Sequence, residues 1–389
     1  MSINSHQPDS LKEKLIAKDT ITRAASNLKK IQSQTFDRDI RILNVCGGHE
    51  RTISDAGLRS LLPEQLKLIP GPGCPICVCP AETINHAISL SNNKHNIVAC
   101  FGDMINVPAN NKKSEVQSLK EAKASGNNIA AVSSPAEVIK LALANSDKTI
   151  IFFVAGFETT MAPIAAMLDQ INHSSINNVK FLISGKKTWP IVSSLLNNND
   201  HNLDGIIAPG HVATIMGEDE WKFIPAEFKV ASAISGFTID SMLSSIHAIL
   251  SQIKNKSPSL ENHYQETVTH QGNPTAQKLI KKYFNTGDSM WRGIGNIKNS
   301  GFTLKSEYQH INAELLIENL TQKTHKSDTP SGCDCPKVTM GQLTPTDCIL
   351  FNKACTPSNP IGACMVSDEG ACQIWWHTLP MQNNQCIST

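Results

Sequence analysis

The chain has 389 residues, of which 40% are hydrophobic and 18% are charged, a composition typical of a globular protein with two or three domains. Its 35 basic residues nearly balance its 34 acidic residues, so it lacks the positive field that binds phosphates, and we expect no nucleic-acid partner. No apolar run approaches the ~20 residues that a membrane helix needs, so we expect no membrane partner either.

The first predicted element is a helix over about residues 10–30, preceded by a polar stretch that has no hydrophobic signal core. From residue 40 to residue 236, short runs rich in Ile, Val and Phe alternate with longer segments of helical spacing. We expect eight strands there, at 40–46, 65–71, 96–103, 128–134, 149–158, 179–185, 205–210 and 228–236. This alternation predicts an α/β fold whose parallel sheets are covered by helices, in two units that divide near residue 135.

Several unusual loops follow directly after predicted strands. They are CGGHE (46–50), GPGCP (71–75), FGD (101–103), GFETT (156–160) and GHV (210–212). Open α/β sheets bind ligands beyond the carboxyl ends of their strands, so these loops are expected to converge on one cleft. Farther along, we expect a helix over about 239–254 and a linker over the polar stretch 321–332.

The 12 cysteines are distributed unevenly along the chain. Five lie in the first third and seven near the C-terminus, namely Cys46, Cys74, Cys77, Cys79, Cys100 and then Cys333, Cys335, Cys348, Cys355, Cys364, Cys372, Cys386. Without a signal peptide, so many thiols indicate a reducing compartment, and we expect a cytoplasmic protein. In such proteins clustered thiols are more often catalytic or metal-binding than structural. Two separate thiol sites are the simplest interpretation.

The first of these sites contains a CxxC pair, Cys74 and Cys77. Two thiols at this spacing can form a disulfide, share a metal, or lower each other's pKa. Half of a zinc site is the alternative, but zinc normally needs a second pair of ligands. The spacing therefore slightly favours redox or transfer chemistry.

Cys46 and His49 flank two glycines in the CGGHE loop. The glycines allow a sharp turn and a close approach of the backbone to a ligand. A thiolate and an imidazole at this spacing could share a metal or act as a nucleophile and its base. The alternative is an ordinary strand-to-helix turn with an exposed histidine.

In the C-terminal region, four cysteines follow the spacing C-x14-C-x6-C-x16-C, and they are Cys333, Cys348, Cys355 and Cys372. Four thiolates without histidine suit an iron–sulfur cluster or a zinc site. Two further thiols, Cys335 and Cys364, could exchange electrons with a cluster as a dithiol pair, which favours iron–sulfur.

Other polar and cysteine residues have plainer interpretations. Asp103 and Glu158 end predicted strands, where each could be a helix cap or a hydrogen-bond acceptor in the cleft. His211 is a loop histidine that could act as a ligand. Cys100, inside a strand, and Cys386, near the chain end, are expected to have no special role.

Taken together, the motifs resemble those of the HypD family of nickel–iron hydrogenase maturation proteins over about residues 40–375. The residues that carry the resemblance are CGGHE, GPGCPICV, FGDMINVP, FFVAGFETT, GHVATIMG, WRGIG and CTPSNPIGACMVSDEGAC. The resemblance implies two Rossmann-like domains around a cleft, at 37–135 and 136–250. It also implies a third domain, at 1–36 and 251–389, that carries a [4Fe–4S] cluster.

The resemblance further implies a scaffold role, together with a small HypC-type partner, for assembly of the Fe(CN)2CO unit of hydrogenase. Cyanide would arrive from a HypE-type donor, which works with HypF. Cys46, with His49 beside it, would hold the iron together with a cysteine of the partner. Cys74 and Cys77 match the family's CPxC pair.

The family's cluster ligands match Cys333, Cys348, Cys355 and Cys372, and the pair beside the cluster matches Cys335 and Cys364. Glu50 and Cys79 stand where the family usually has threonine. Two other functions remain open at this point. One is a stand-alone iron–sulfur disulfide reductase that uses Cys74 and Cys77, and the other is a zinc-stabilised binding module.

Overall fold

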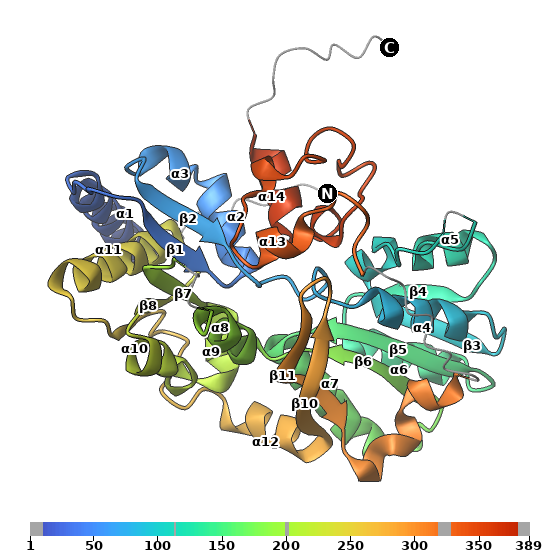
Figure 1. The fold of residues 1–389 in the computed structure, drawn as a ribbon. Coiled ribbons are helices and arrows are strands. Elements are labelled where there is room, and N and C mark those ends of the chain that lie inside the picture. Colours follow the sequence, from blue (N-terminus) through green and yellow to red (C-terminus); the bar gives the residue numbers. More distant parts are fainter. Residues whose placement is uncertain (1–10, 113, 199–201, 318–327, 380–389) are drawn as a thin grey trace.

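The computed structural model describes residues 11–112, 114–198, 202–317 and 328–379. Two parallel sheets covered by helices confirm the predicted α/β class (Figure 1). Cys386 and most of the predicted linker at 321–332 lie outside the described residues.

The first sheet has five parallel strands in the order β2-β1-β7-β8-β9. Their bounds are Leu66–Pro70 (β2), Ile40–Asn44 (β1), Gly205–Pro209 (β7), Ala231–Ser235 (β8) and Leu260–His263 (β9). Alternate residues face opposite sides, so that Ile42 packs in one core cluster and Leu43 in another. The sheet is thus buried on both faces, as its nearly continuous apolar strands require.

The second sheet has four parallel strands in the order β4-β3-β5-β6. Their bounds are Ile129–Val132 (β4), Asn96–Phe101 (β3), Thr149–Gly156 (β5) and Val179–Gly185 (β6). The same alternation operates here, with Phe152 and Phe181 on one face and Phe153 and Leu182 on the other.

All eight strands expected from the sequence are present, but they are shared between the sheets in an interleaved way. The first sheet takes strands from residues 40–70 and 205–263, and the second takes those from 96–185. The break expected near residue 135 falls between β4 and β5, which belong to the same sheet. The chain leaves the first sheet after two strands, builds the second completely, and then returns.

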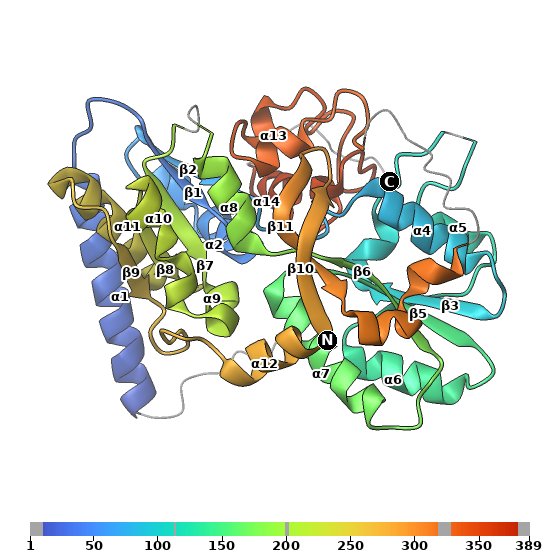
Figure 2. The same cartoon turned by 60° about the horizontal axis from the view of Figure 1, so that its bottom comes forward.

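Helices cover the sheets and connect their strands (Figures 1 and 2). Those described are α1 (Leu11–Gln32), α2 (Gly47–Asp55), α3 (Leu58–Leu61), α4 (Ala81–Ser91), α5 (Leu119–Ala124), α6 (Pro135–Ala144), α7 (Glu158–Asn172), α8 (Thr188–Leu196), α9 (Gly210–Met216), α10 (Phe223–Phe228), α11 (Ile239–Asn255), α12 (Pro274–Tyr283), α13 (Cys335–Thr339) and α14 (Ala371–Thr378). The expected helices at 10–30 and 239–254 correspond to α1 and α11.

Two segments occupy the space between the sheets. An antiparallel hairpin, β10 (Phe284–Trp291) and β11 (Gly295–Leu304), rises between them in Figure 1. The cysteine-rich segment with α13 and α14 lies over the junction of the two sheets in both views. This segment, residues 328–379, is called the C-terminal segment below.

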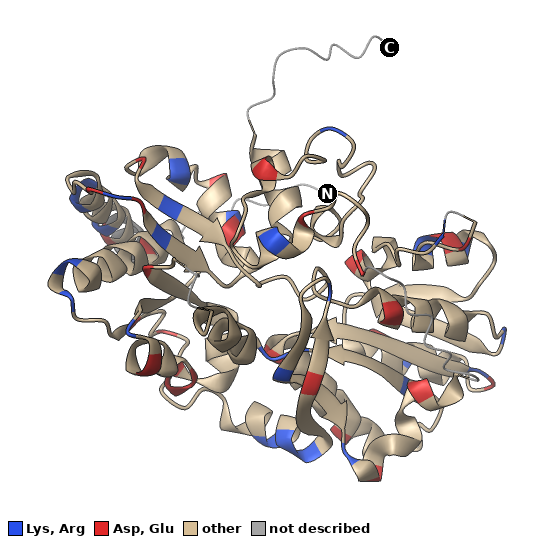
Figure 3. Ribbon diagram, in the orientation of Figure 1, with Lys and Arg blue, Asp and Glu red and all other residues tan. Residues whose placement is uncertain are grey.

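Charged residues of both signs are interspersed over helices and loops around both sheets (Figure 3). Among the described residues, no helix combines the length and the apolar character needed to cross a lipid bilayer.

Candidate functional site

The CGGHE loop lies where the strand order of the first sheet changes direction. β1 pairs with β2 on one side and with β7 on the other, so the loops after β1 and β7 flank this switch point. Cys46 follows β1, and His211 follows β7 as part of α9. Ligands of open α/β sheets bind at such a point, so the sheet topology supports a site at Cys46.

Glycines bring the GPGC loop into contact with the CGGHE loop. A Cβ atom on Gly73 would overlap the backbone of Cys46, and one on Gly71 would lie 2.7 Å from the carbonyl oxygen of Asn44. The amide of Gly47 also donates to the carbonyl of Gly73 at 3.3 Å. The GPG sequence is therefore needed for the close packing that places Cys74 beside the Cys46 loop.

Cys46 and His49 both belong to the first turn of α2, where Cys46 is the N-cap residue. Burial raises the pKa of the Cys46 thiol to about 12, while the backbone amides of His49 and Gly48 act in the opposite direction. Bound metal would offset this burial cost, because the thiolate is the form that coordinates metal.

The imidazole of His49 is fully buried and neutral. Its Nε2 lies 2.9 Å from the carbonyl oxygen of Ser235, so Nε2 carries the proton and donates it. Burial lowers the pKa of His49 to about 4. Nδ1 has no hydrogen-bond partner among the described residues and keeps its lone pair. Phe237 packs between this ring and His211, with ring centroids 4.8 and 3.8 Å away.

The CxxC pair is present as a disulfide. Cys74 and Cys77 are bonded, with their Cα atoms 5.3 Å apart. Both residues pack in a buried cluster with cysteines of the C-terminal segment. Cys79 behaves differently, because its Sγ lies 3.4 Å from Ser184 Oγ inside the core of the second sheet.

Six cysteines of the C-terminal segment line one small cavity, and they are Cys333, Cys335, Cys348, Cys355, Cys364 and Cys372. Among the residues that the structure describes, no three His, Cys, Asp or Glu side chains are arranged to hold a single metal ion. A four-iron cluster binds each cysteine to a different iron, so its ligands stand farther apart than those of one ion. Four thiols around a shared cavity fit such a cluster in number and chemistry.

Cys364 connects this cavity to the loops of the first sheet. Its Sγ lies 2.6 Å from Cys335 Sγ. A second small cavity is bordered by Cys46, Cys74 and Cys364, together with Glu369. The structure therefore brings together Cys46, the CxxC pair and the cysteines of the C-terminal segment, which lie far apart in the sequence.

Contacts that sequence reasoning did not predict hold the C-terminal segment over both sheets. Asp103, after β3, accepts a hydrogen bond from the Asp368 amide at 3.2 Å. Arg51, on α2, donates to the Asp368 carbonyl. Asp103 was one of the acceptors considered from its place at a strand end, whereas nothing in the sequence indicated its partner.

Glu158, expected in a loop, is the first residue of α7 and a buried acid beyond the end of β5 in the second sheet. Its carboxylate accepts hydrogen bonds from the Thr188 amide at 2.8 Å and from the Thr188 hydroxyl at 3.0 Å. Burial raises the pKa of Glu158 to about 7, although these hydrogen bonds oppose the shift. The folded chain thus favours the protonated acid.

This raised pKa predicts a pH-dependent effect of Glu158→Gln. The stability that the protonated acid provides is complete below the ordinary pKa of 4.5 and is lost as the pH rises to about 7. The variant, which cannot ionise, should unfold at the same denaturant concentration as the parent near pH 4.5. Near pH 8 it should be more stable by up to about 3 kcal/mol. Equal stability of the two proteins near pH 8 would contradict this account.

Comparisons with known proteins agree with the resemblance of the motifs. The sequence model of the HypD family, described as "Hydrogenase formation hypA family", matches residues 19–378. The chain is 37% identical over 356 residues to a putative hydrogenase expression/formation protein of Methanocaldococcus jannaschii, covering 92% of this chain and 96% of that protein. It is 36% identical over 345 residues to the hydrogenase maturation factor HypD of Escherichia coli, covering 88% and 90%.

A third relative, the hydrogenase maturation factor HypD of Azotobacter vinelandii, is 33% identical over 347 residues, with coverage of 87% and 89%. The similarity therefore extends over nearly the full length of all three relatives and includes both sheets and the C-terminal segment. The chain belongs to the HypD family of hydrogenase maturation factors.

Proposed function

We propose that this maturation factor binds iron at Cys46 and, with a small HypC-type partner, is the scaffold on which the Fe(CN)2CO unit is assembled. Iron is the substrate in this scheme, and a soft thiolate is a suitable ligand for it. Cys46 lies at the switch point of the first sheet, and His49 beside it keeps an unshared Nδ1. A cysteine of the partner would be the second thiolate, so the partner should dock around residues 46–50.

The electrons for this assembly would come from the C-terminal segment. Cys333, Cys348, Cys355 and Cys372 would hold a [4Fe–4S] cluster, which supplies electrons one at a time when bound. Cys335 and Cys364 would collect them as a dithiol, because two neighbouring thiols store two electrons when a disulfide is reduced.

The position of Cys364 is the single observation that carries the proposal, since this residue borders both cavities. Its thiolate can attack Cys74 Sγ, which breaks the disulfide and releases Cys77 as a thiolate. Cys335 then attacks Cys364 and releases Cys74. The net result is that two electrons and two protons pass from one pair of thiols to the other.

The reduced CxxC pair would then act on the cyanide donor. A HypE-type partner presents a thiocyanate, whose cleavage to a thiol and cyanide consumes two electrons. Cys74 and Cys77 can supply both electrons by forming their disulfide again. Because Cys74 borders the same cavity as Cys46, the released cyanide would be formed next to the iron.

The exchange step can be tested by trapping its mixed disulfide. In a variant that carries Cys77→Ser and Cys335→Ser, neither Cys74 nor Cys364 keeps its resolving partner, so the mild oxidant diamide should link Cys74 to Cys364 in anaerobically purified protein. Peptide mass spectrometry would identify this bond. The matched variant, Cys74→Ser with Cys335→Ser, leaves only Cys77 of the CxxC pair, which does not border the shared cavity, and should cross-link to Cys364 far less. Equal cross-linking of the two variants, or none in the variant that keeps Cys74, would contradict the proposed route.

A further inference from the structure

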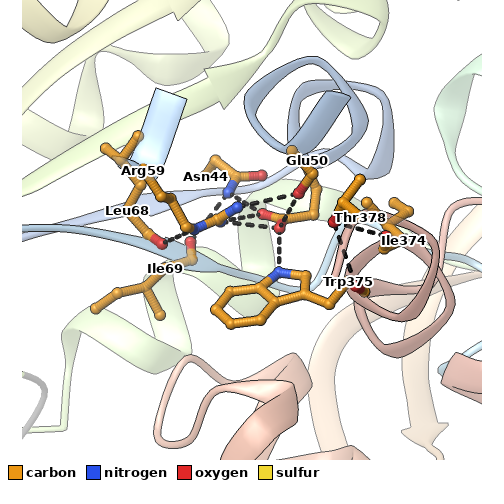
Figure 4. A network of polar contacts seen from close by, with 9 residues as sticks. Asn44, Glu50, Arg59, Leu68, Ile69, Ile374, Trp375 and Thr378 are labelled. Atoms are coloured by element: carbon orange, nitrogen blue, oxygen red, sulfur yellow. Dashed lines mark hydrogen bonds and ion pairs between the residues drawn. The ribbon is translucent and has the colours of Figure 1, made fainter. Parts of the chain in front are cut away.

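A buried carboxylate joins helix α2 to the C-terminal helix α14. Glu50, on α2, accepts hydrogen bonds from Arg59 Nη2 at 2.8 and 2.9 Å and from Asn44 Nδ2 at 2.8 Å. Trp375, on α14, donates its indole Nε1–H to the same carboxylate from 325 positions farther along the chain. Figure 4 shows these donors converging on Glu50, with the Arg59 guanidinium 4.6 Å from the centre of the Trp375 ring.

Because Glu50 is buried, its carboxylate needs the hydrogen bonds that these donors provide. The residue is only 2% exposed, and an ionised carboxylate is stable in such a place only when its oxygens are paired. Arg59 supplies the opposite charge and is itself held by Leu68 and Ser54, to which it donates at 3.1 Å. Among the described residues, Trp375 is the one donor to this carboxylate that comes from outside residues 44–59. Asn44 and Arg59 already hold the Glu50 carboxylate, and the docking of α14 adds the indole of Trp375 as a further hydrogen-bond donor.

The docking of α14 also determines where Cys364 lies. The residues just before α14 pack on the first turn of α2, since a Cβ on Gly47 would lie 2.6 Å from the carbonyl oxygen of Glu369. The same residues pack on Cys364, because a Cβ on Gly370 would overlap its carbonyl. A chain of close contacts thus runs from the Glu50 network through the start of α14 to Cys364.

We propose that Glu50 is a positioning residue that acts through Trp375 to hold Cys364 opposite Cys74 for thiol–disulfide exchange. This inference rests on the proposed function. Glu50 takes no part in the exchange itself, because its oxygens are occupied by their donors. The Cys335–Cys364 pair lies within the C-terminal segment, so its own disulfide does not depend on the network.

The test uses the full chain carrying Cys77→Ser and Cys335→Ser and follows the rate at which diamide links Cys74 to Cys364. Adding Trp375→Phe removes the indole donor but keeps an aromatic ring beside Arg59. This change should slow the cross-link about ten-fold, as expected for loss of a hydrogen bond to a buried charge. Adding Glu50→Ala instead should slow it at least as much.

Trp376→Phe is the matched control. Trp376 Nε1 donates to Asn352 Oδ1 at 3.0 Å inside the C-terminal segment. Loss of this hydrogen bond therefore leaves the contacts between α14 and α2 intact. The cross-linking rate should stay at the parental value. Formation of the Cys335–Cys364 disulfide, measured in matched chains that keep Cys335 and carry Cys74→Ser, should be unchanged by each of these substitutions.

Each outcome bears on a separate part of the proposal. A parental cross-linking rate in Trp375→Phe would overturn the role of Glu50 and leave the proposed function standing. If both disulfides slowed together, the substitution would act on folding of the C-terminal segment, and the positioning role would again be wrong. A parent chain that forms no bond between Cys74 and Cys364 would overturn the exchange itself and this inference with it.

Discussion

Replacing Cys74 with Ser is expected to abolish hydrogenase maturation while leaving intact the visible absorption of the proposed iron–sulfur cluster. The disulfide with Cys77 is lost, so no thiol pair remains to receive two electrons beside Cys46. The cluster should survive because its proposed ligands all come from the C-terminal segment. Hydrogenase activity of a deletion strain complemented with each variant measures the effect, and Cys77→Ser should give the same result.

Cys79→Thr is the matched control for this experiment. Cys79 is fully buried, burial raises its pKa, and its Sγ faces Ser184 in the core of the second sheet. A threonine hydroxyl can keep the contact with Ser184, so full activity is expected. Full activity of Cys74→Ser would eliminate the redox role of the pair. Loss of activity with Cys79→Thr would show instead that the third thiol takes part.

Cys355→Ala is expected to remove the proposed cluster and to destabilise the C-terminal segment. The four proposed ligands close intervals of 14, 6 and 16 residues, and the described segment between them has only short helices. A cross-link over a loop of ~15 residues contributes about 3 kcal/mol, and metal binding adds to folding in the same way. Iron and acid-labile sulfide per chain should fall, together with the melting temperature.

Cys100→Ala provides the comparison for Cys355→Ala. Cys100 is fully buried in β3, far in sequence from the proposed ligands, so its replacement should cost some packing energy but no iron. Unchanged iron, sulfide and melting temperature in Cys355→Ala would refute the proposed ligand set.

The strands of both sheets could be predicted from the sequence because they are buried on both faces. Runs such as that of β5, Thr149–Gly156, are continuously apolar and rich in Ile, Val and Phe. β9 and the hairpin β10–β11 were not predicted. β9 is a short edge strand with no fully buried residue, and β10 and β11 contain several glycines as well as Asn and Asp at exposed positions. Those residues are more typical of turns than of strands.

The sharing of strands between the sheets could not be predicted, because a strand's residues do not specify its neighbours. β1 pairs with β7 only after the chain has completed the second sheet. Hydrophobic periodicity indicates which residues are buried, but it does not indicate which strands pair with each other. The strands were therefore divided in chain order, which predicted a break near residue 135.

The candidate site was partly visible in the sequence. GPGCP was among the loops expected to converge on one cleft, and the structure shows that Gly73 is needed for its contact with Cys46. The contact between Glu50 and Trp375 had no local signal, since it joins residues 325 positions apart. Such pairs follow from the tertiary packing of the C-terminal segment on α2.

Infrared spectroscopy of the chain purified with its HypC-type partner tests the proposed iron site most directly. After co-expression with the maturation partners, the parent should show the bands of iron-bound CO and cyanide. Cys46→Ala should lack these bands but retain the visible absorption of the cluster, because Cys46 does not border the cavity of the C-terminal cysteines. Cyanide bands that persist in Cys46→Ala would show that iron is held elsewhere. A parent with no bands at all would contradict the scaffold function and favour the alternative of a stand-alone disulfide reductase.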